Sequence, residues 1–145
     1  MSNHGSGITA EMRVAVEDLL SEFAARVDDG RGDSVHELFV QTGGIETPTF
    51  KLVGREEIQR RFAARARDHA RKTRHFWSNP RFSGDPSRIL VTTNVLTVVH
   101  MQGQTSLMGG TSHDVVVPHA GSWAFAERRL EIAFEGDLVS RGPQS

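Results

Sequence analysis

A carboxylate and an imidazole in this sequence could together move a proton. Asp28 lies near the end of an apolar helical stretch, and His75 lies in the segment 73–80, Thr-Arg-His-Phe-Trp-Ser-Asn-Pro. A carboxylate beside an imidazole selects its tautomer and stabilises the imidazolium, while the imidazole transfers a proton near neutral pH. If the fold brings the two side chains together beside an apolar pocket, they have the chemistry of a general base.

Asp28 extends an apolar ridge along the first predicted helix. The ridge has i, i+4 spacing and consists of Val16, Leu20 and Ala24. Partial burial and the negative end of the helix dipole are both expected to raise the pKa of the Asp28 carboxyl group. The alternative is that residues 28–30, Asp-Asp-Gly, form a solvated helix exit, and helix geometry alone favours this second interpretation.

Strand alternation places His75 on one face with Trp77 and Asn79. An imidazole, an indole and a carboxamide on one face suit a pocket with a polar end. The alternative is a structural histidine at a strand edge whose hydrogen bonds are made within the fold, and the two interpretations have about equal weight. The residues predicted to contact a substrate are Phe23, Trp77, Asn79, Met101, Met108, His113, Phe125 and Arg129.

The composition is that of an ordinary globular protein. Its 145 residues are 37% hydrophobic and 24% charged, and the formal net charge of -1 argues against a nucleic-acid partner. The chain has no cysteine, so disulfides and thiolate chemistry are excluded, and the histidines lack the spacing of a metal site. Without a long apolar run or a signal-peptide pattern, we expect a cytoplasmic protein with no membrane partner.

The order of predicted elements indicates an α+β fold. A long helix runs from a Thr9 N-cap to Gly30, short helices start at Asp33 and near Gly54, and a hairpin lies between them at 45–53. Strands are then predicted at 73–82, 88–101, 105–117 and 122–134, and the short turns between them indicate an antiparallel meander. We expect one domain over residues 8–139, with flexible tails at 1–7 and 140–145, whose sheet wraps around the first helix.

Several short motifs resemble one family. Residues 23–30, followed by Phe39, resemble the first-helix motif of SnoaL-like proteins of the nuclear-transport-factor-2-like superfamily. The segment 73–75 with Asn79 is similar to the strand motif that carries the histidine of the family. Gly109-Gly110 and the segment 123–125, Trp-Ala-Phe, match its late strands. The resemblance implies a cone-shaped barrel in which a curved sheet surrounds the first helix.

The resemblance also implies an activity. Within the superfamily the pattern is similar to the scytalone dehydratase and hexachlorocyclohexane dehydrochlorinase group, in which an aspartate–histidine pair removes a proton. Carried over, His75 is the general base and Asp28 its orienting partner, in a cofactor-independent lyase or isomerase acting on a small apolar molecule. The chain departs from the group in having no tyrosine, so another donor must assist the leaving group.

A second hypothesis is a non-catalytic ligand-binding or assembly module, because one fold hosts several functions. An open pocket with Asp28 and His75 in contact favours the enzyme, whereas a cavity filled by Trp77, Met108 and Phe125 favours the module.

Two surface features bear on assembly. The basic tract from Arg55 to Arg74 is first interpreted as a solvated face or a subunit contact, and an anion site is the less favoured alternative. The strand 89–101 is apolar on both faces, and one face, with Leu90, Leu96 and Val98, is not needed for the cavity. We therefore predict a homo-oligomer, with a dimer as the commonest solution and a trimer as the main alternative.

Overall fold

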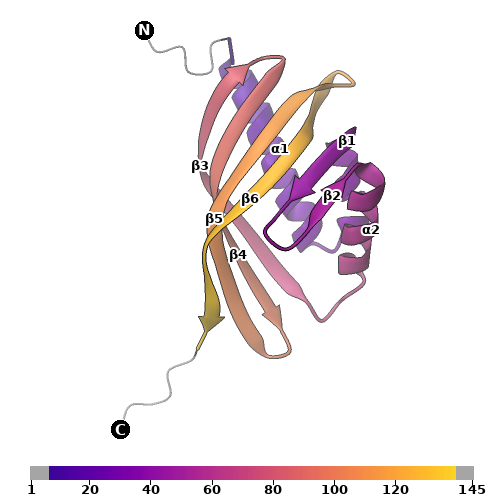
Figure 1. The fold of residues 1–145 in the computed structure, drawn as a ribbon, viewed down its shortest axis with the longest axis vertical. Helices are drawn as coiled ribbons and strands as arrows, with labels where there is room; N and C mark the ends of the chain where they lie inside the picture. Colours follow the sequence, from indigo (N-terminus) through magenta and orange to yellow (C-terminus); the bar gives the residue numbers. More distant parts are fainter. Residues whose placement is uncertain (1–6, 140–145) are drawn as a thin grey trace.

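The computed structural model describes residues 7–139, which form a curved sheet with helices packed against it (Figure 1). The predicted α+β class and the curved sheet around a long N-terminal helix are confirmed. The predicted tails, 1–7 and 140–145, lie outside the described residues except for Gly7. No helix in the described part of the chain has both the length and the apolar character needed to cross a membrane.

The first helix, α1 (Ala10–Asp28), has the ends that its capping residues predict. The Thr9 side chain accepts a hydrogen bond from the Met12 N–H at 3.1 Å, and Gly30 adopts a left-handed conformation after the last turn. The apolar ridge faces the sheet, where Val16 and Leu20 are buried. Asp28 is therefore the last helical residue of a face that packs inward, and α1 contacts β3 there.

The segment after α1 contains a 3₁₀ helix η1 (Gly32–Leu38), strands β1 (Phe39–Glu46) and β2 (Lys51–Val53), and helix α2 (Arg55–Ala66). The predicted hairpin is present, but its first strand begins at Phe39 instead of Ile45. The reason is tertiary: Phe39 pairs with Phe125 of the last strand, which extends the strand beyond the segment that its local sequence indicates.

The four long strands are β3 (Lys72–Asp85), β4 (Arg88–Met101), β5 (Gln104–His119) and β6 (Ser122–Leu138). They form the predicted antiparallel meander, and the strand order of the complete sheet is β2-β1-β6-β5-β4-β3. One pairing in the sheet is parallel, because β1 runs in the same direction as β6. The chain between β1 and β6 includes α2 and the meander, so it is long enough for such a crossing.

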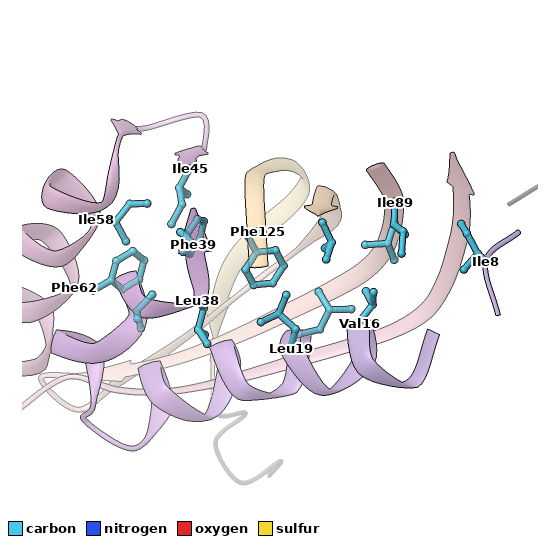
Figure 2. Packing of buried hydrophobic residues seen from close by; sticks show 14 residues of the cluster. Ile8, Val16, Leu19, Leu38, Phe39, Ile45, Ile58, Phe62, Ile89 and Phe125 are labelled. Atoms are coloured by element: carbon cyan, nitrogen blue, oxygen red, sulfur yellow. The ribbon is translucent and has the colours of Figure 1, made fainter. Parts of the chain in front are cut away.

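The hydrophobic core occupies only one end of the concave side. Figure 2 shows Val16 and Leu19 of α1 pointing toward Phe125 and Ile89 of the sheet. Along β4 the inward residues Ile89 and Val91 are fully buried, whereas Val99 near the end of the strand is only half-buried. The other end of the concave side is therefore left open, and the candidate site lies there.

The outer side of the sheet carries an uncovered apolar row. Phe76, Leu96, Gly109 and Phe134 lie opposite one another on four successive strands. A Cβ on Gly109 would collide with the ring of Phe134, so the glycine makes room for that ring. Phe76 is 56% exposed and Phe134 is 58% exposed. Within residues 7–139 this row therefore has no cover.

Candidate active site

Asp28 and His75 are in direct contact. Asp28 Oδ1 lies 2.6 Å from His75 Nδ1 and also accepts a hydrogen bond from the Thr73 hydroxyl at 2.8 Å. Asp28 Oδ2 accepts a hydrogen bond from the backbone N–H of His75 at 2.9 Å. The side chain of Asp28 is 10% exposed and that of His75 is 24% exposed. The predicted contact between the carboxylate and the imidazole is therefore present, and the carboxylate cannot rotate without losing several donors.

Two elements create this contact. Asp28 ends α1, and Thr73 and His75 are alternate residues near the start of β3, so both point to the concave side. The backbone N–H of His75 bonds to the Asp28 carboxylate at the edge of the sheet, where β3 has a neighbour on one side only. The unpaired edge of β3 thus supplies the donor that holds Asp28 in place.

The pKa of Asp28 moves in the direction opposite to the one expected. Burial does disfavour the ionised form, but the hydrogen bonds from the His75 ring, the His75 backbone and the Thr73 hydroxyl outweigh it. The pKa of Asp28 is consequently lowered from its usual value near 3.8. The expected rise is wrong because helix position alone does not reveal how many donors the strand brings to the carboxylate.

The ionised carboxylate determines the tautomer of His75. A carboxylate can only accept hydrogen bonds, so His75 Nδ1 must carry the proton that is shared with Asp28. His75 Nε2 then carries the lone pair. Within residues 7–139, no backbone or side-chain group forms a hydrogen bond with Nε2. This nitrogen is the one available to accept a proton from a bound molecule.

A cavity of about 530 Å³ lies beside the dyad, with His75 on its wall. That volume suits a small organic molecule. Of the predicted contact residues, Phe23, Trp77 and Met108 line it and leave it unfilled. Arg129 also borders it, but its guanidinium is 40% exposed and pairs with Glu131 at 2.5 Å.

The structure does not bring the other four predicted contact residues to the cavity. Phe125 is fully buried in the core. Asn79 lies in a bulge of β3 with a positive φ of 55°, which interrupts strand alternation, and it is exposed and does not line the cavity. Met101 pairs with Gln104 at the β4–β5 turn, beyond the cavity. His113 pairs with Thr92, on the outer side of the sheet.

Arg128 lines the cavity but is not among the residues predicted from the sequence. Its Nε and Nη2 donate to the two oxygens of Asp114 at 2.8 and 3.0 Å, and Asp114 is only 2% exposed. The guanidinium carbon lies 4.4 Å from the ring centroid of Phe23 and 4.5 Å from that of Phe125. Ser112 donates a further hydrogen bond to Asp114 at 2.9 Å. The result is a positive charge held rigidly in a largely apolar wall.

A β-bulge explains why Arg128 and not Arg129 faces inward. Val116 pairs with Phe125, whereas the preceding residue, Val115, pairs with Glu127, so one residue of β6 is unpaired. Strict alternation from the inward-facing Phe125 would place Arg129 on the concave side. The extra residue reverses the alternation and directs Arg128 inward. The only available sequence signal was the presence of Asp114 and Arg128 on two consecutive predicted strands.

Comparisons with known proteins agree on the fold. The family model of the SnoaL-like domain matches residues 9–129. A candidate scytalone dehydratase from Novosphingobium aromaticivorans is similar in structure, with 24% identity, 90% of this chain and 89% of that chain covered, and a TM-score of 0.79. No curated protein matches the sequence.

Two further solved structures share the fold at lower identity. The type 2 hexachlorocyclohexane dehydrochlorinase LinA is 16% identical, with 93% of this chain and 94% of that chain covered and a TM-score of 0.77. A candidate aromatic ring hydroxylase from Novosphingobium aromaticivorans is 17% identical, with 90% and 95% covered and a TM-score of 0.82. The names of these neighbours differ in chemistry, so the likeness shows the fold, and the reaction must be argued from the site.

Proposed function

The chain belongs to the SnoaL-like domain family, and we propose that it is a cofactor-independent lyase or isomerase that removes a proton from a small, mostly apolar molecule. One observation carries the proposal: His75 lines a cavity with Nε2 unengaged while its Nδ1 is held by an ionised Asp28. This arrangement is what a general base requires, because the base must present a lone pair in a fixed direction.

The proposed reaction begins with transfer of a carbon-bound proton to His75 Nε2. Asp28 stabilises the imidazolium that forms, through the hydrogen bond at Nδ1. In an elimination, the electron pair of the broken C–H bond becomes a new double bond while hydroxide or halide leaves the neighbouring carbon. The proton on His75 then passes to the departing hydroxide as water, or to solvent. In an isomerisation, the same proton returns to a different carbon.

Arg128 is the group that we assign to the developing negative charge. Its guanidinium borders the same cavity and is already oriented by Asp114, so little reorganisation is needed during the reaction. The cation replaces the tyrosine donors that this chain lacks. Because His75 pairs with Thr97 and Asp114 pairs with Val91 on β4, the base and the cation lie at different depths of the cavity. A substrate between them would be deprotonated at one end and polarised at the other.

The open cavity supports this proposal over a non-catalytic module. Trp77 and Met108 line the cavity, and Phe125 belongs to the core, so the side chains that could have filled the space leave it free. The names of two structural neighbours, a candidate scytalone dehydratase and a hexachlorocyclohexane dehydrochlorinase, also support elimination as the reaction class.

Proton abstraction can be tested before the substrate is known. A panel of small β-hydroxy ketones and chlorinated cyclohexanes is incubated with the protein in D2O, and NMR records loss of carbon-bound protons and appearance of alkenes. His75→Ala should abolish both signals, because the variant lacks the imidazole that Asp28 orients on the cavity wall. His113→Ala is the matched control, since His113 lies on the outer side of the sheet, and it should retain them. Equal activity of His75→Ala and wild type would disprove the proposal.

A further inference from the structure

Two arginines border the cavity at its boundary with a second hollow. Arg65 comes from the last turn of α2, and Arg71 precedes β3. Both line the main cavity and also the neighbouring hollow, whose wall includes Asp28 and Thr73. They belong to the basic tract whose first interpretation was a solvated face or a subunit contact. The fold instead turns these two members of the tract toward the candidate site.

Both guanidinium groups are partly withdrawn from water. Arg65 and Arg71 are half-buried, and the Nε atom of Arg71 is fully buried without a hydrogen-bond partner. Burial lowers the pKa of Arg65 to about 10, with further contributions from the nearby charges of Arg71 and Arg61. Burying a cation next to another cation costs free energy, so such a pair needs a compensating partner.

Within residues 7–139, no salt bridge supplies that compensation. None of the ion pairs found there includes Arg65 or Arg71. Glu135 and Asp137 border the cavity, and Asp28, Asp29 and Asp68 border the neighbouring hollow, but none of them forms a salt bridge with either arginine. Arg128, by contrast, is fully paired with Asp114. Of the four arginines that line the cavity, Arg128 and Arg129 are therefore paired with carboxylates, whereas Arg65 and Arg71 form no salt bridge within residues 7–139.

The surroundings of these cations favour an organic anion with an apolar body. Arg65 lies over the ring of Phe62 at 5.4 Å, and Arg61 lies over the ring of Phe50 at 4.2 Å. Phe62 and Phe50 line the cavity as well. A guanidinium offers a planar fork of donors that matches a carboxylate, and two of them can hold one carboxylate from both sides.

We propose that the substrate carries a carboxylate that binds to Arg65 and Arg71, while its apolar body extends past His75 into the cavity. The inference rests on the proposed function for the identity of the cavity as a substrate site, and it narrows the substrate from an apolar molecule to an amphipathic organic acid. The carboxylate is held at the opening of the cavity, and the reacting carbon lies between that opening and Arg128.

The test compares two ligands of nearly the same shape, one with a carboxylate and one with a neutral amide. 1-Naphthylacetate and its neutral analogue 1-naphthylacetamide are titrated into the protein by calorimetry. Wild type should bind the carboxylate at least about tenfold more tightly, as expected for hydrogen bonds between charged groups. Arg65→Met and Arg71→Met should each reduce this preference, and the double variant should abolish it. Arg60→Met is the matched control, because Arg60 is exposed on the same helix and borders neither hollow, and it should leave the preference unchanged.

Several results would overturn the inference. They are equal affinity of wild type for the two ligands, no carboxylate binding at all, or a preference that survives in the double variant. Tighter binding of inorganic phosphate than of naphthylacetate would also overturn it, because the site would then fit a phosphoryl group better. The measurement involves no turnover, so it is independent of the proposed reaction. A preserved anion preference in a protein without elimination or exchange activity would reject the proposed function alone.

Discussion

Replacing Asp28 with asparagine should separate the effect of Asp28 on the activity of His75 from its effect on the stability of the fold. An asparagine has one acceptor oxygen and one donor NH2 group in place of the two acceptor oxygens of the carboxylate. The backbone N–H of His75 can only donate, so the side-chain oxygen of the variant must face it. The NH2 group then faces the Thr73 hydroxyl and His75 Nδ1. The hydroxyl can accept, and the imidazole can accept only if its proton moves to Nε2.

The expected magnitudes follow from this rearrangement. Asp28→Asn keeps a hydrogen-bond partner for the His75 backbone N–H, the Thr73 hydroxyl and His75 Nδ1, the last two now as acceptors, so its unfolding free energy should fall by less than about 1 kcal/mol. Asp28→Ala leaves the backbone N–H of His75 without an acceptor, and that group cannot move. The Thr73 hydroxyl and the His75 ring can rotate toward other partners. This variant should lose about 1–3 kcal/mol. Activity behaves differently: with the proton on Nε2 the base is blocked, and turnover should fall by about 10⁴ in Asp28→Asn, the loss known for the equivalent change in a serine protease triad.

Two measurements check the reasoning. Urea unfolding gives the two stability losses, and ¹⁵N chemical shifts of the His75 ring report which nitrogen is protonated. The shifts should identify an Nδ1–H tautomer in the wild type and an Nε2–H tautomer in Asp28→Asn. If Asp28→Asn keeps the wild-type tautomer, or loses as much stability as Asp28→Ala, the assigned hydrogen-bond directions are wrong.

Three further outcomes are expected. The pKa of Asp28 is lowered in the folded protein, so the ionised carboxylate stabilises the fold fully above the usual pKa near 3.8, and this stabilisation is lost as the pH falls through the pKa of the folded state. Urea unfolding between pH 7 and 3 should therefore show wild type losing stability relative to Asp28→Asn below about pH 4. A difference that stays constant with pH would contradict the lowered pKa. Arg128→Met leaves the buried Asp114 carboxylate unpaired and should cost about 3–5 kcal/mol, whereas a cost below about 1 kcal/mol would show that the pair contributes little. Leu96→Glu should dissociate the predicted homo-oligomer by placing a charge beside Phe134 on the uncovered row, and light scattering that finds wild type itself at 16.0 kDa would refute the oligomer.

The local sequence predicted the elements and the pair at the centre of the site. The helical spacing of Val16 and Leu20, with a capping Thr9, depends on interactions within a few turns, so it determines α1 almost to the residue. The long strands and their tight turns follow from alternation and turn residues in the same way. Asp28 and His75 were identifiable because each stands in a short segment with its own pattern, which the family resemblance reinforced.

The tertiary structure decided which side chains face the cavity and in which state. A single bulge in β6 places Arg128 instead of Arg129 on the concave side, because one extra residue reverses every later position of a strand. A second bulge, in β3, removes Asn79 from the alternation that places His75 and Trp77 on the cavity wall. The lowered pKa of Asp28 depends on donors from Thr73 and His75, which only the packing of α1 against β3 brings near. The inward turn of Arg65 and Arg71 likewise depends on where α2 docks. Local propensity sets helices and strands, whereas register, docking and the balance between burial and hydrogen bonding arise from contacts between segments far apart in the chain.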